Sequence, residues 1–313
     1  MKNFFRKLLL LVGGAGLSII TVAQTPTDGL LMPKGDICFL LNFEYGQFDH
    51  YWEGETLRKN GTIAKVQRRS ALVMAAYGIT NKLDAYVGLR YVSTNSTTPN
   101  GGKFAGTEGI QDLTLGLKYE AIRKKNEKGE LTAFGSLVFA TPASNYLSDY
   151  QPYSLGIGAP QLAWRAIVEY EWNKGLYLRG NGGYTWKGYT EAEREYYYND
   201  GSYYTAWMDV PSAWTYEAVL GKWFMEKSLR VELSYNSSIS TSGDDIRAYN
   251  APQPTNKVNM DRVGAFAQYF FKKPKGLGIV ASYSRVIHGR NAPELSSISA
   301  GVTYQFGLFT SKN

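Results

Sequence analysis

Apolar residues stand at every second position along about twelve segments of this chain. The clearest segment is 112–121 (DLTLGLKYEA), in which polar or small residues alternate with apolar or aromatic ones. Asp112, Lys118 and Glu120 fall in one row, and because ionisable groups cannot face hydrocarbon, that row must face a polar interior. A barrel in an outer membrane needs this pattern, since its strands show one face to lipid and the other to a wet lumen.

The first residues are typical of an export signal. Lys2, Arg6 and Lys7 form a charged beginning, residues 8–22 are apolar, and Ala23 is a small residue suited to cleavage. A retained transmembrane helix is the alternative, but the apolar stretch is short for a span and three glycines interrupt it. We predict a cleaved signal peptide over residues 1–23 and a single outer-membrane barrel domain over residues 24–313.

Charge and cysteine content exclude several classes of protein. The formal net charge is +7, and removing Lys2, Arg6 and Lys7 leaves +4, which is too mild to indicate nucleic-acid binding. A single cysteine, Cys38, excludes an internal disulfide framework and a cysteine-based zinc site. Cys38 lies in an apolar strand pattern and is predicted to be buried. The mean hydropathy of −0.30 does not argue against a barrel, because only one side of each strand is apolar.

Alternation and turn signals predict an all-β fold, an antiparallel barrel of about twelve strands, with fourteen as the alternative if a loop contains a hairpin. The strands are predicted at Asp36–Phe48, Val66–Ile79, Leu83–Val92, Gly109–Ile122, Leu131–Ala140, Pro160–Trp172, Leu176–Lys187, Ser212–Phe224, Leu229–Ser237, Val258–Phe270, Leu277–Ile287 and Ser296–Phe306. The two faces of Val66–Ile79 stay unassigned, because 71–76 is apolar on both. An even strand number places both termini and the short turns in the periplasm, and the long loops outside the cell.

Aromatic residues are the second sign of a membrane barrel. The chain has 24 Tyr, 14 Phe and 7 Trp, and rings at strand ends are typical of the girdles at the water–lipid boundary. A soluble sandwich rich in aromatic residues is the alternative. The candidate girdle residues are Tyr91, Tyr119, Trp172, Trp186, Trp223, Tyr269 and Phe306.

Two motifs carry a resemblance to a known family. The turn 77–83 (YGITNKL) is followed some thirty residues later by the strand 109–119 (GIQDLTLGLKY). Both are similar to motifs in outer-membrane transporters of the meta-pathway phenol-degradation family. The resemblance covers residues 66–122 and implies a barrel distantly similar to long-chain fatty acid transporters, which admits aromatic or other apolar compounds. These motifs describe a turn and a strand, so they bear on architecture more than on substrate.

Catalytic chemistry has few candidates in this chain. His50 and His288 are the only histidines, both near the predicted outer rim, where an outer-membrane lipid hydrolase would hold its triad. No serine stands two residues after either histidine, so ordinary rim histidines are the favoured interpretation. The pair Asp244 and Asp245 fits a solvated loop better than an aspartyl protease or a calcium loop. We predict no enzyme, no metal site and no cofactor.

Ionisable residues on the polar rows predict the lining of a lumen. Both signs are mixed, so cross-strand ion pairs can offset the cost of desolvation. One interpretation is a transport path lined by these groups, and the other is a packed polar core that only braces the barrel. The candidate lumen residues are Asp84, Arg90, Asp112, Lys118, Glu120, Arg165, Glu169, Arg179, Glu217, Arg230 and Glu232.

A tyrosine-rich loop predicts a contact surface outside the cell. Exposed aromatic residues at this density suit an apolar ligand, lipopolysaccharide or a partner, whereas folding back over the barrel mouth is the alternative. The candidate contact residues are Tyr196, Tyr197, Tyr198, Tyr203, Tyr204 and Trp207.

The function predicted from these features is passive passage of a small apolar or aromatic solute through the bacterial outer membrane. A lipid hydrolase and a structural or adhesive barrel with a plugged lumen are the alternatives. The expected partners are outer-membrane lipid, lipopolysaccharide, the solute and, during insertion, the barrel-assembly machinery, with no nucleic acid.

Overall fold

A computed structural model gives the fold, and it describes residues 25–61, 64–96, 106–191, 197–199, 203–246 and 253–308. The predicted signal peptide of residues 1–23 lies outside these ranges and stays a prediction. None of the helices among the described residues is long and apolar enough to cross a membrane, a finding that does not bear on strands.

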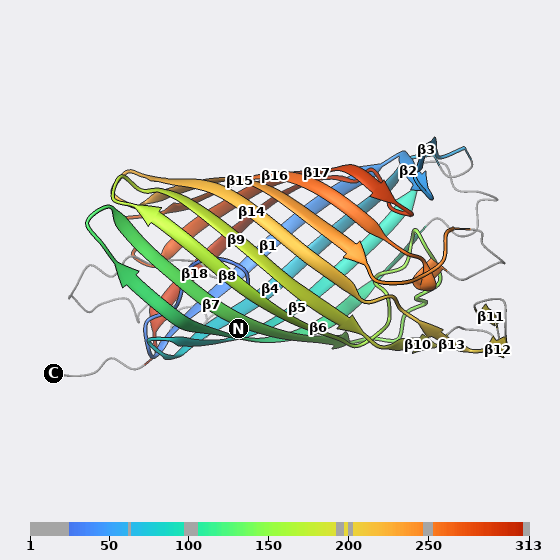
Figure 1. Ribbon diagram of the computed structural model, residues 1–313, viewed down its shortest axis with the longest axis horizontal. Helices are drawn as coiled ribbons and strands as arrows, with labels where there is room; N and C mark the ends of the chain where they lie inside the picture. Colours follow the sequence, from blue (N-terminus) through green and yellow to red (C-terminus); the bar gives the residue numbers. More distant parts are fainter. Residues whose placement is uncertain are drawn as a thin grey trace, which may run out of the picture.

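Twelve antiparallel strands close into one barrel, with β1 hydrogen-bonded to both β18 and β4 (Figure 1). The barrel strands are β1 (Asp36–Phe48), β4 (Val66–Thr80), β5 (Leu83–Ser96), β6 (Gly106–Lys125), β7 (Gly129–Pro142), β8 (Gln161–Trp172), β9 (Leu176–Lys187), β14 (Ala213–Phe224), β15 (Leu229–Ser240), β16 (Asn259–Phe270), β17 (Leu277–Arg290) and β18 (Ser296–Gly307). Neighbours along the chain are neighbours in the sheet, and closure removes every free strand edge. The predicted strand number is confirmed.

Side-chain alternation explains why this sequence closes around a polar interior. In β5, Asp84 and Tyr86 are buried inside the barrel, whereas Val87 and Leu89 are exposed on the outer wall. Every barrel strand repeats this division, so large apolar side chains cover the outside of the closed sheet. Such a continuous apolar wall is unstable in water and stable in lipid. The chain is therefore a bacterial outer-membrane β-barrel.

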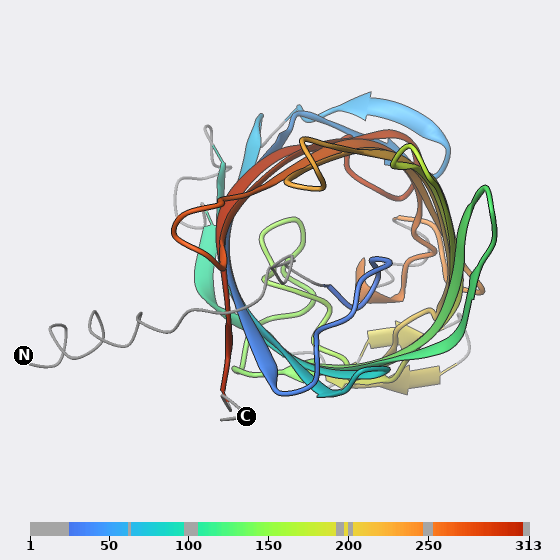
Figure 2. The same ribbon diagram turned by 90° about the vertical axis from the view of Figure 1, so that its left-hand side faces the viewer.

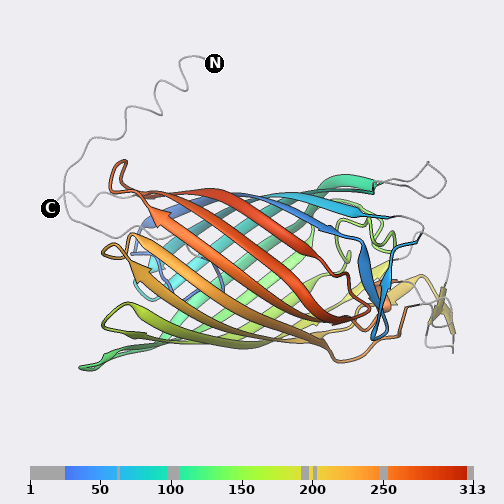
Figure 3. The same cartoon turned by 90° about the horizontal axis from the view of Figure 1, so that it is seen from above.

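Short turns lie at one end of the barrel and long loops at the other (Figure 3). The first barrel strand begins and the last one ends at the end with the short turns, where Asp36 pairs with Gly307 and Leu308 N donates to Gly35 O at 3.0 Å. The loops carry three small hairpins and one 3-10 helix: β2 (His50–Glu53) with β3 (Thr56–Lys59), β10 (Tyr189–Glu191) with β13 (Trp207–Asp209), β11 (Tyr197–Asn199) with β12 (Tyr203–Thr205), and η3 (Gln253–Thr255). These hairpins stand outside the barrel sheet, so the described parts of the loops add no thirteenth or fourteenth strand.

The structure assigns the two faces of β4. Ser70, Met74 and Ala76 are buried inside, and Val73 is exposed on the outer wall. Cys38 is buried as predicted, against Met32 and other luminal residues. Pattern alone could not decide these faces, because an apolar segment of the chain fills the lumen next to β4.

One predicted girdle residue is wrong. Trp223 faces the lumen and packs against Phe270, with ring centroids 6.3 Å apart. It shares its face of β14 with Gly221, whose missing side chain makes room for the ring of Tyr177. Its neighbour Phe224 takes the outward position instead.

Two segments other than the strands occupy the lumen (Figure 2). Residues 25–35, which precede β1, enter the barrel at the short-turn end. The loop 143–160, between β7 and β8, folds inward at the other end, where Tyr153 and Leu155 are buried. Both ends of the lumen are therefore partly filled by chain.

Candidate functional site

The N-terminal segment is tied to the barrel wall through Lys118. This β6 side chain is fully buried, and its Nζ donates to Asp28 Oδ1 at 2.8 Å, to Thr25 O at 2.8 Å and to Asp28 O at 3.2 Å. The rings of Tyr86 and Phe134 flank the ammonium at 5.4 and 5.9 Å. A lysine can be buried here because every donor finds an acceptor on the entering segment.

A second set of contacts, besides those of Lys118, joins the same segment to β4 and β5. Met32 N donates to Asp84 Oδ2 at 2.9 Å, and Tyr86 Oη donates to the same oxygen at 3.2 Å. A Cβ atom on Gly78 would lie 2.2 Å from Pro33 O, so the segment runs directly against the β4 backbone. Residues 25–35 are thus held by charge, hydrogen bonds and close backbone packing.

A network of buried ion pairs faces the segment from the opposite wall. Arg179 on β9 binds Glu232 on β15 through both terminal nitrogens, at 3.0 and 3.1 Å, and reaches Glu169 on β8 at 3.3 Å. Tyr177 Oη donates to Glu232 Oε1 at 2.5 Å. Arg230 lies over the Phe266 ring at 5.1 Å. Such bidentate geometry lets acids and bases stay charged away from bulk water.

The loop 143–160 is bonded to a charged group on the wall of β4 to β6. Arg68 donates to Ser154 O at 3.3 Å and to Leu155 O at 2.8 Å. Beneath it, Arg90 donates to Glu44 Oε2 at 3.2 Å. Tyr146 Oη donates to Asp112 Oδ1 at 2.8 Å, and burial, followed by the Asp112 charge, raises the pKa of this tyrosine above its usual range. The loop is therefore held to the wall by one hydroxyl donor, Tyr146 Oη, and by two carbonyl acceptors, those of Ser154 and Leu155.

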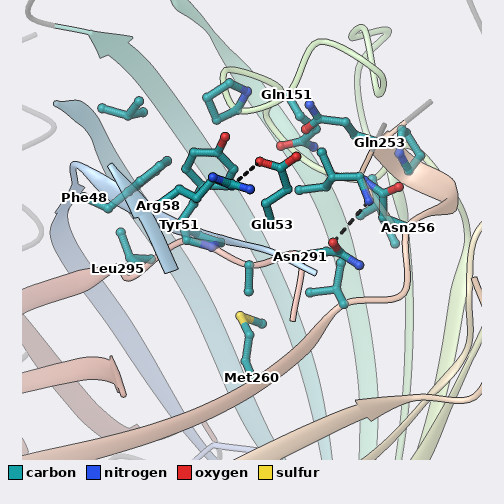
Figure 4. A pocket seen from close by; sticks show the side chains of 18 of the residues that line it. Phe48, Tyr51, Glu53, Arg58, Gln151, Gln253, Asn256, Met260, Asn291 and Leu295 are labelled. Atoms are coloured by element: carbon teal, nitrogen blue, oxygen red, sulfur yellow. Dashed lines mark hydrogen bonds and ion pairs between the residues drawn. The ribbon is translucent and has the colours of Figure 1, made fainter. Parts of the chain in front are cut away.

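A cavity of about 1100 Å³ lies at the loop end of the barrel (Figure 4). Phe48 and Leu295 stand on one side of it, and Met260 closes it toward the barrel interior. Half of the lining side chains are apolar. Polar side chains also line it, and Glu53 and Arg58, which lie above Met260 in Figure 4, form an ion pair at 2.7 Å.

A smaller pocket of about 110 Å³ continues toward the middle of the lumen. Arg165, Asn181 and Glu217 line it, together with Arg262. Asn181 donates to Glu217, and Met260 borders both this pocket and the large cavity. The described lumen therefore has an accessible upper part and a lower part that is filled by residues 25–35.

The family described as "Putative MetA-pathway of phenol degradation" matches residues 65–302 of this sequence, well over half of the chain. The chain belongs to this family. The match extends the resemblance of residues 66–122 over nearly the whole barrel. Comparison with curated protein sequences gives no match.

Comparison with solved structures finds outer-membrane proteins. An outer membrane channel from Pseudomonas putida F1 superposes with a TM-score of 0.71 at 12% identity, over 91% of this chain and 100% of that one. The NanC porin gives 0.48 at 11% identity, over 84% and 98%. A mutant of the monoaromatic hydrocarbon channel TodX gives 0.43 at 11% identity, over 88% and 91%. The first of these likenesses shows a shared fold, and the other two scores are too low to carry an argument.

The predicted lumen residues of this family member all face the interior of the barrel, ten of them in two groups and Glu120 apart from both. Asp84, Lys118, Glu169, Arg179, Arg230 and Glu232 pack at the level of residues 25–35. Arg90, Asp112, Arg165 and Glu217 lie nearer the cavity. Glu120 is buried close to a short turn and pairs with Arg123. Their part in passage stays a prediction.

The predicted contact loop is described only in part. Tyr196 lies outside the described residues. Tyr197 and Tyr198 belong to β11, and Tyr203 and Tyr204 to β12, which pair with each other at the tip of the loop. Trp207, in β13, is exposed. Whether this loop binds a partner stays a prediction.

The two histidines do not form a catalytic group in the described part of the chain. His50 Nδ1 lies 2.9 Å from Asp49 Oδ1, and this hydrogen bond holds the pKa of Asp49 below its usual range. His288 is on the outer wall, 3.4 Å from Asp261. Asp245 binds Arg290, and no cluster suited to a metal ion occurs among the described residues.

Two features could not be foreseen from the sequence: residues 25–35 inside the lumen, and the cavity between this segment and the loop end of the barrel. Asp28 lies in a short polar stretch without alternation, so no periodic signal marks it. The one available signal was Lys118, a lysine in the middle of a membrane strand, which requires an acidic partner somewhere.

Proposed function

We propose that this barrel lets a small apolar or aromatic compound pass through the outer membrane, down its concentration gradient. Membership of the phenol-degradation family supports this function, as does the closed barrel with an accessible cavity at its loop end. The proposal includes no catalytic step and no cofactor.

The observation that carries the proposal is the composition of the cavity. Its apolar lining includes Phe48, Val66 and Met260, and its volume is ample for a compound with one or two aromatic rings. Apolar surface at the outer mouth of a membrane barrel offers a solute a place to leave water before it passes the polar lumen.

Residues 25–35 stand between this cavity and the periplasm. Passage therefore requires the segment to shift, and its bonds to Lys118 and Asp84 set the cost of that shift. This shift does not require the barrel to unfold, because residues 25–35 form no hydrogen-bonded strand of its sheet.

Solute uptake into proteoliposomes tests the proposal. Purified barrel, shown to be folded by heat-modifiable migration, should admit a small neutral aromatic compound faster than protein-free liposomes do. Uptake equal to that of protein-free liposomes would remove the transport function. It would favour a structural barrel with a plugged lumen, the alternative that the occupied lower lumen supports.

The remaining expectations form part of the same proposal. We infer that residues 1–23 are a cleaved signal peptide, that the barrel-assembly machinery inserts the chain, and that the outer loops contact lipopolysaccharide. The lipid-hydrolase alternative predicts phospholipid cleavage by the pure protein that is lost on His50→Ala or His288→Ala. We propose instead that the pure protein does not cleave phospholipid.

A further inference from the structure

The charged side chains at the loop end of the lumen are mostly cationic. Arg58, Lys59, Arg68 and Lys187 line the large cavity, against one acid, Glu53. Glu53 is already paired with Arg58 at 2.7 Å. The cavity therefore holds basic groups that its own acid does not neutralise.

Lys187 lies on the wall of the large cavity, at the loop end of β9. It ends β9 on the luminal face, one residue after the outward-facing Trp186. Among the described residues its Nζ has no ion pair and no hydrogen bond, although the side chain is half-buried. A half-buried ammonium without an acceptor is costly, and a bound anion would offset that cost.

The positive charge of Arg68 at the same cavity is not neutralised by its hydrogen-bond partners, because these are the carbonyl oxygens of Ser154 and Leu155. The nearest acids have other partners. Glu44 accepts from Arg90, and Asp112 accepts from Tyr146. These two acids reduce the positive potential near Arg68 without pairing with it.

The smaller pocket continues the same imbalance, since Arg165 and Arg262 line it with one acid, Glu217. Counting both cavities together with Arg90, Glu44 and Asp112 gives seven cations against four acids among the described residues. Low-dielectric walls strengthen the field of such an excess, so the upper lumen favours anions.

We infer that the cavity binds an organic carboxylate with an aromatic or alkyl body. The inference rests on the proposed function and narrows its substrate class. The apolar lining packs against the body, and Lys187 and Arg68 hold the carboxylate by charge-assisted hydrogen bonds. A neutral ring of the same size gains only the first of these interactions.

Two naphthalene probes of equal size separate these contributions. At neutral pH, 2-naphthoate is ionised and 2-naphthol is neutral, and both are fluorescent. Titration into the detergent-solubilised barrel should show the carboxylate binding about tenfold more tightly, a preference that Lys187 and Arg68 share. Lys187→Met and Arg68→Gln should each reduce that preference to about threefold or less while leaving naphthol binding unchanged. Gln is chosen because it can still donate to the loop carbonyls.

Lys222→Met is the matched control. Lys222 is a lysine on the outer wall, with Nζ 5.1 Å from the Phe224 ring centroid, and its loss should leave both affinities unchanged. Equal binding of the two probes by the unaltered protein overturns the inference. So does a preference for naphthoate that neither luminal variant reduces.

Proteoliposome uptake of the same probes distinguishes this failure from failure of the proposed function. Uptake of naphthol, together with equal binding of the two probes in the titration, leaves passage standing and overturns the anion site. A naphthoate preference in the titration, with no uptake of either probe, supports the anion site and removes passage.

Discussion

The Nζ atom of Lys118 lies 2.8 Å from Oδ1 of Asp28, and both side chains are buried inside the barrel. This contact joins the middle of the barrel wall to a segment that belongs to no strand. Because neither group reaches bulk water, each depends on the other to stay charged. The contact is therefore one of those that hold residues 25–35 in the lumen.

Asp28→Asn should loosen residues 25–35, which plug the lower lumen. The amide cannot neutralise Lys118, so the buried ammonium loses its acid and the segment shifts to let water in. We expect higher solute uptake into proteoliposomes and faster cleavage of residues 25–35 by added protease. Thr27→Ala, in the same segment but without a hydrogen bond to a barrel strand among the described residues, should behave as the unaltered protein. Unchanged uptake and cleavage in Asp28→Asn would show that the pair does not hold the plug.

Gly78→Ala should expel the same segment by a steric route. Its Cβ would lie 2.2 Å from Pro33 O, a backbone atom that must move. Gly135→Ala is the matched control, because a Cβ there meets nothing within 4 Å. Uptake should rise in the first variant and stay constant in the second. Equal uptake in both would mean that Pro33 moves without freeing the lumen.

The twelve barrel strands could be predicted from sequence because alternation is a local signal. Leu176–Lys187 has the predicted bounds, since Arg179 and Asn181 point inward while Leu178 points outward. Trp223 was misplaced for the opposite reason. A girdle assignment needs the face as well as the strand end, and Gly221 beside it marks the crowded luminal face.

The candidate site was less predictable, because it forms between segments that are distant in sequence. The Lys118–Asp28 pair joins residues 90 positions apart, and Arg68 meets Leu155 at a separation of 87. Alternation shows that these basic groups face inward, but it does not say which partner reaches them. The hairpin of β2 and β3 was also missed, since His50–Glu53 is too short for a periodic pattern.

Arg179→Met should destabilise the barrel. It leaves Glu232 and Glu169 without their shared arginine in a buried site, which costs about 3 kcal/mol or more in the free energy of unfolding. Urea unfolding in detergent, followed by heat-modifiable migration, measures this loss. Leu178→Met, a lipid-facing change on the same strand, should cost about 1 kcal/mol or less. A loss in Arg179→Met no larger than that control would show that the network adds no net stability.

Acid should release the loop before β16. Hydrogen bonds from Arg290 and Asn291 hold the pKa of Asp245 below its ordinary value of 3.8. Because the folded-state pKa is depressed, the stabilisation is present above the ordinary value and is lost as pH falls through the lower, folded-state pKa. Amide exchange at Ile246, which donates to Asn291 Oδ1 at 3.2 Å, should lose protection over that acidic range.

Asp245→Asn should remove this pH dependence, with protection at Ile246 already low at neutral pH. The amide of Ala143, which donates to Gln111 O at 2.9 Å, is the internal control because no carboxylate takes part in its bond. A parallel loss of protection at both amides would point to general acid unfolding instead of release of the loop.

Uptake of a small neutral aromatic solute by proteoliposomes, compared between the unaltered barrel and Gly78→Ala, tests the central claim most directly. Uptake should exceed that of protein-free liposomes for the unaltered protein and should increase further when Pro33 is displaced. Correctly folded barrels of both kinds that admit no more solute than bare lipid would contradict this claim.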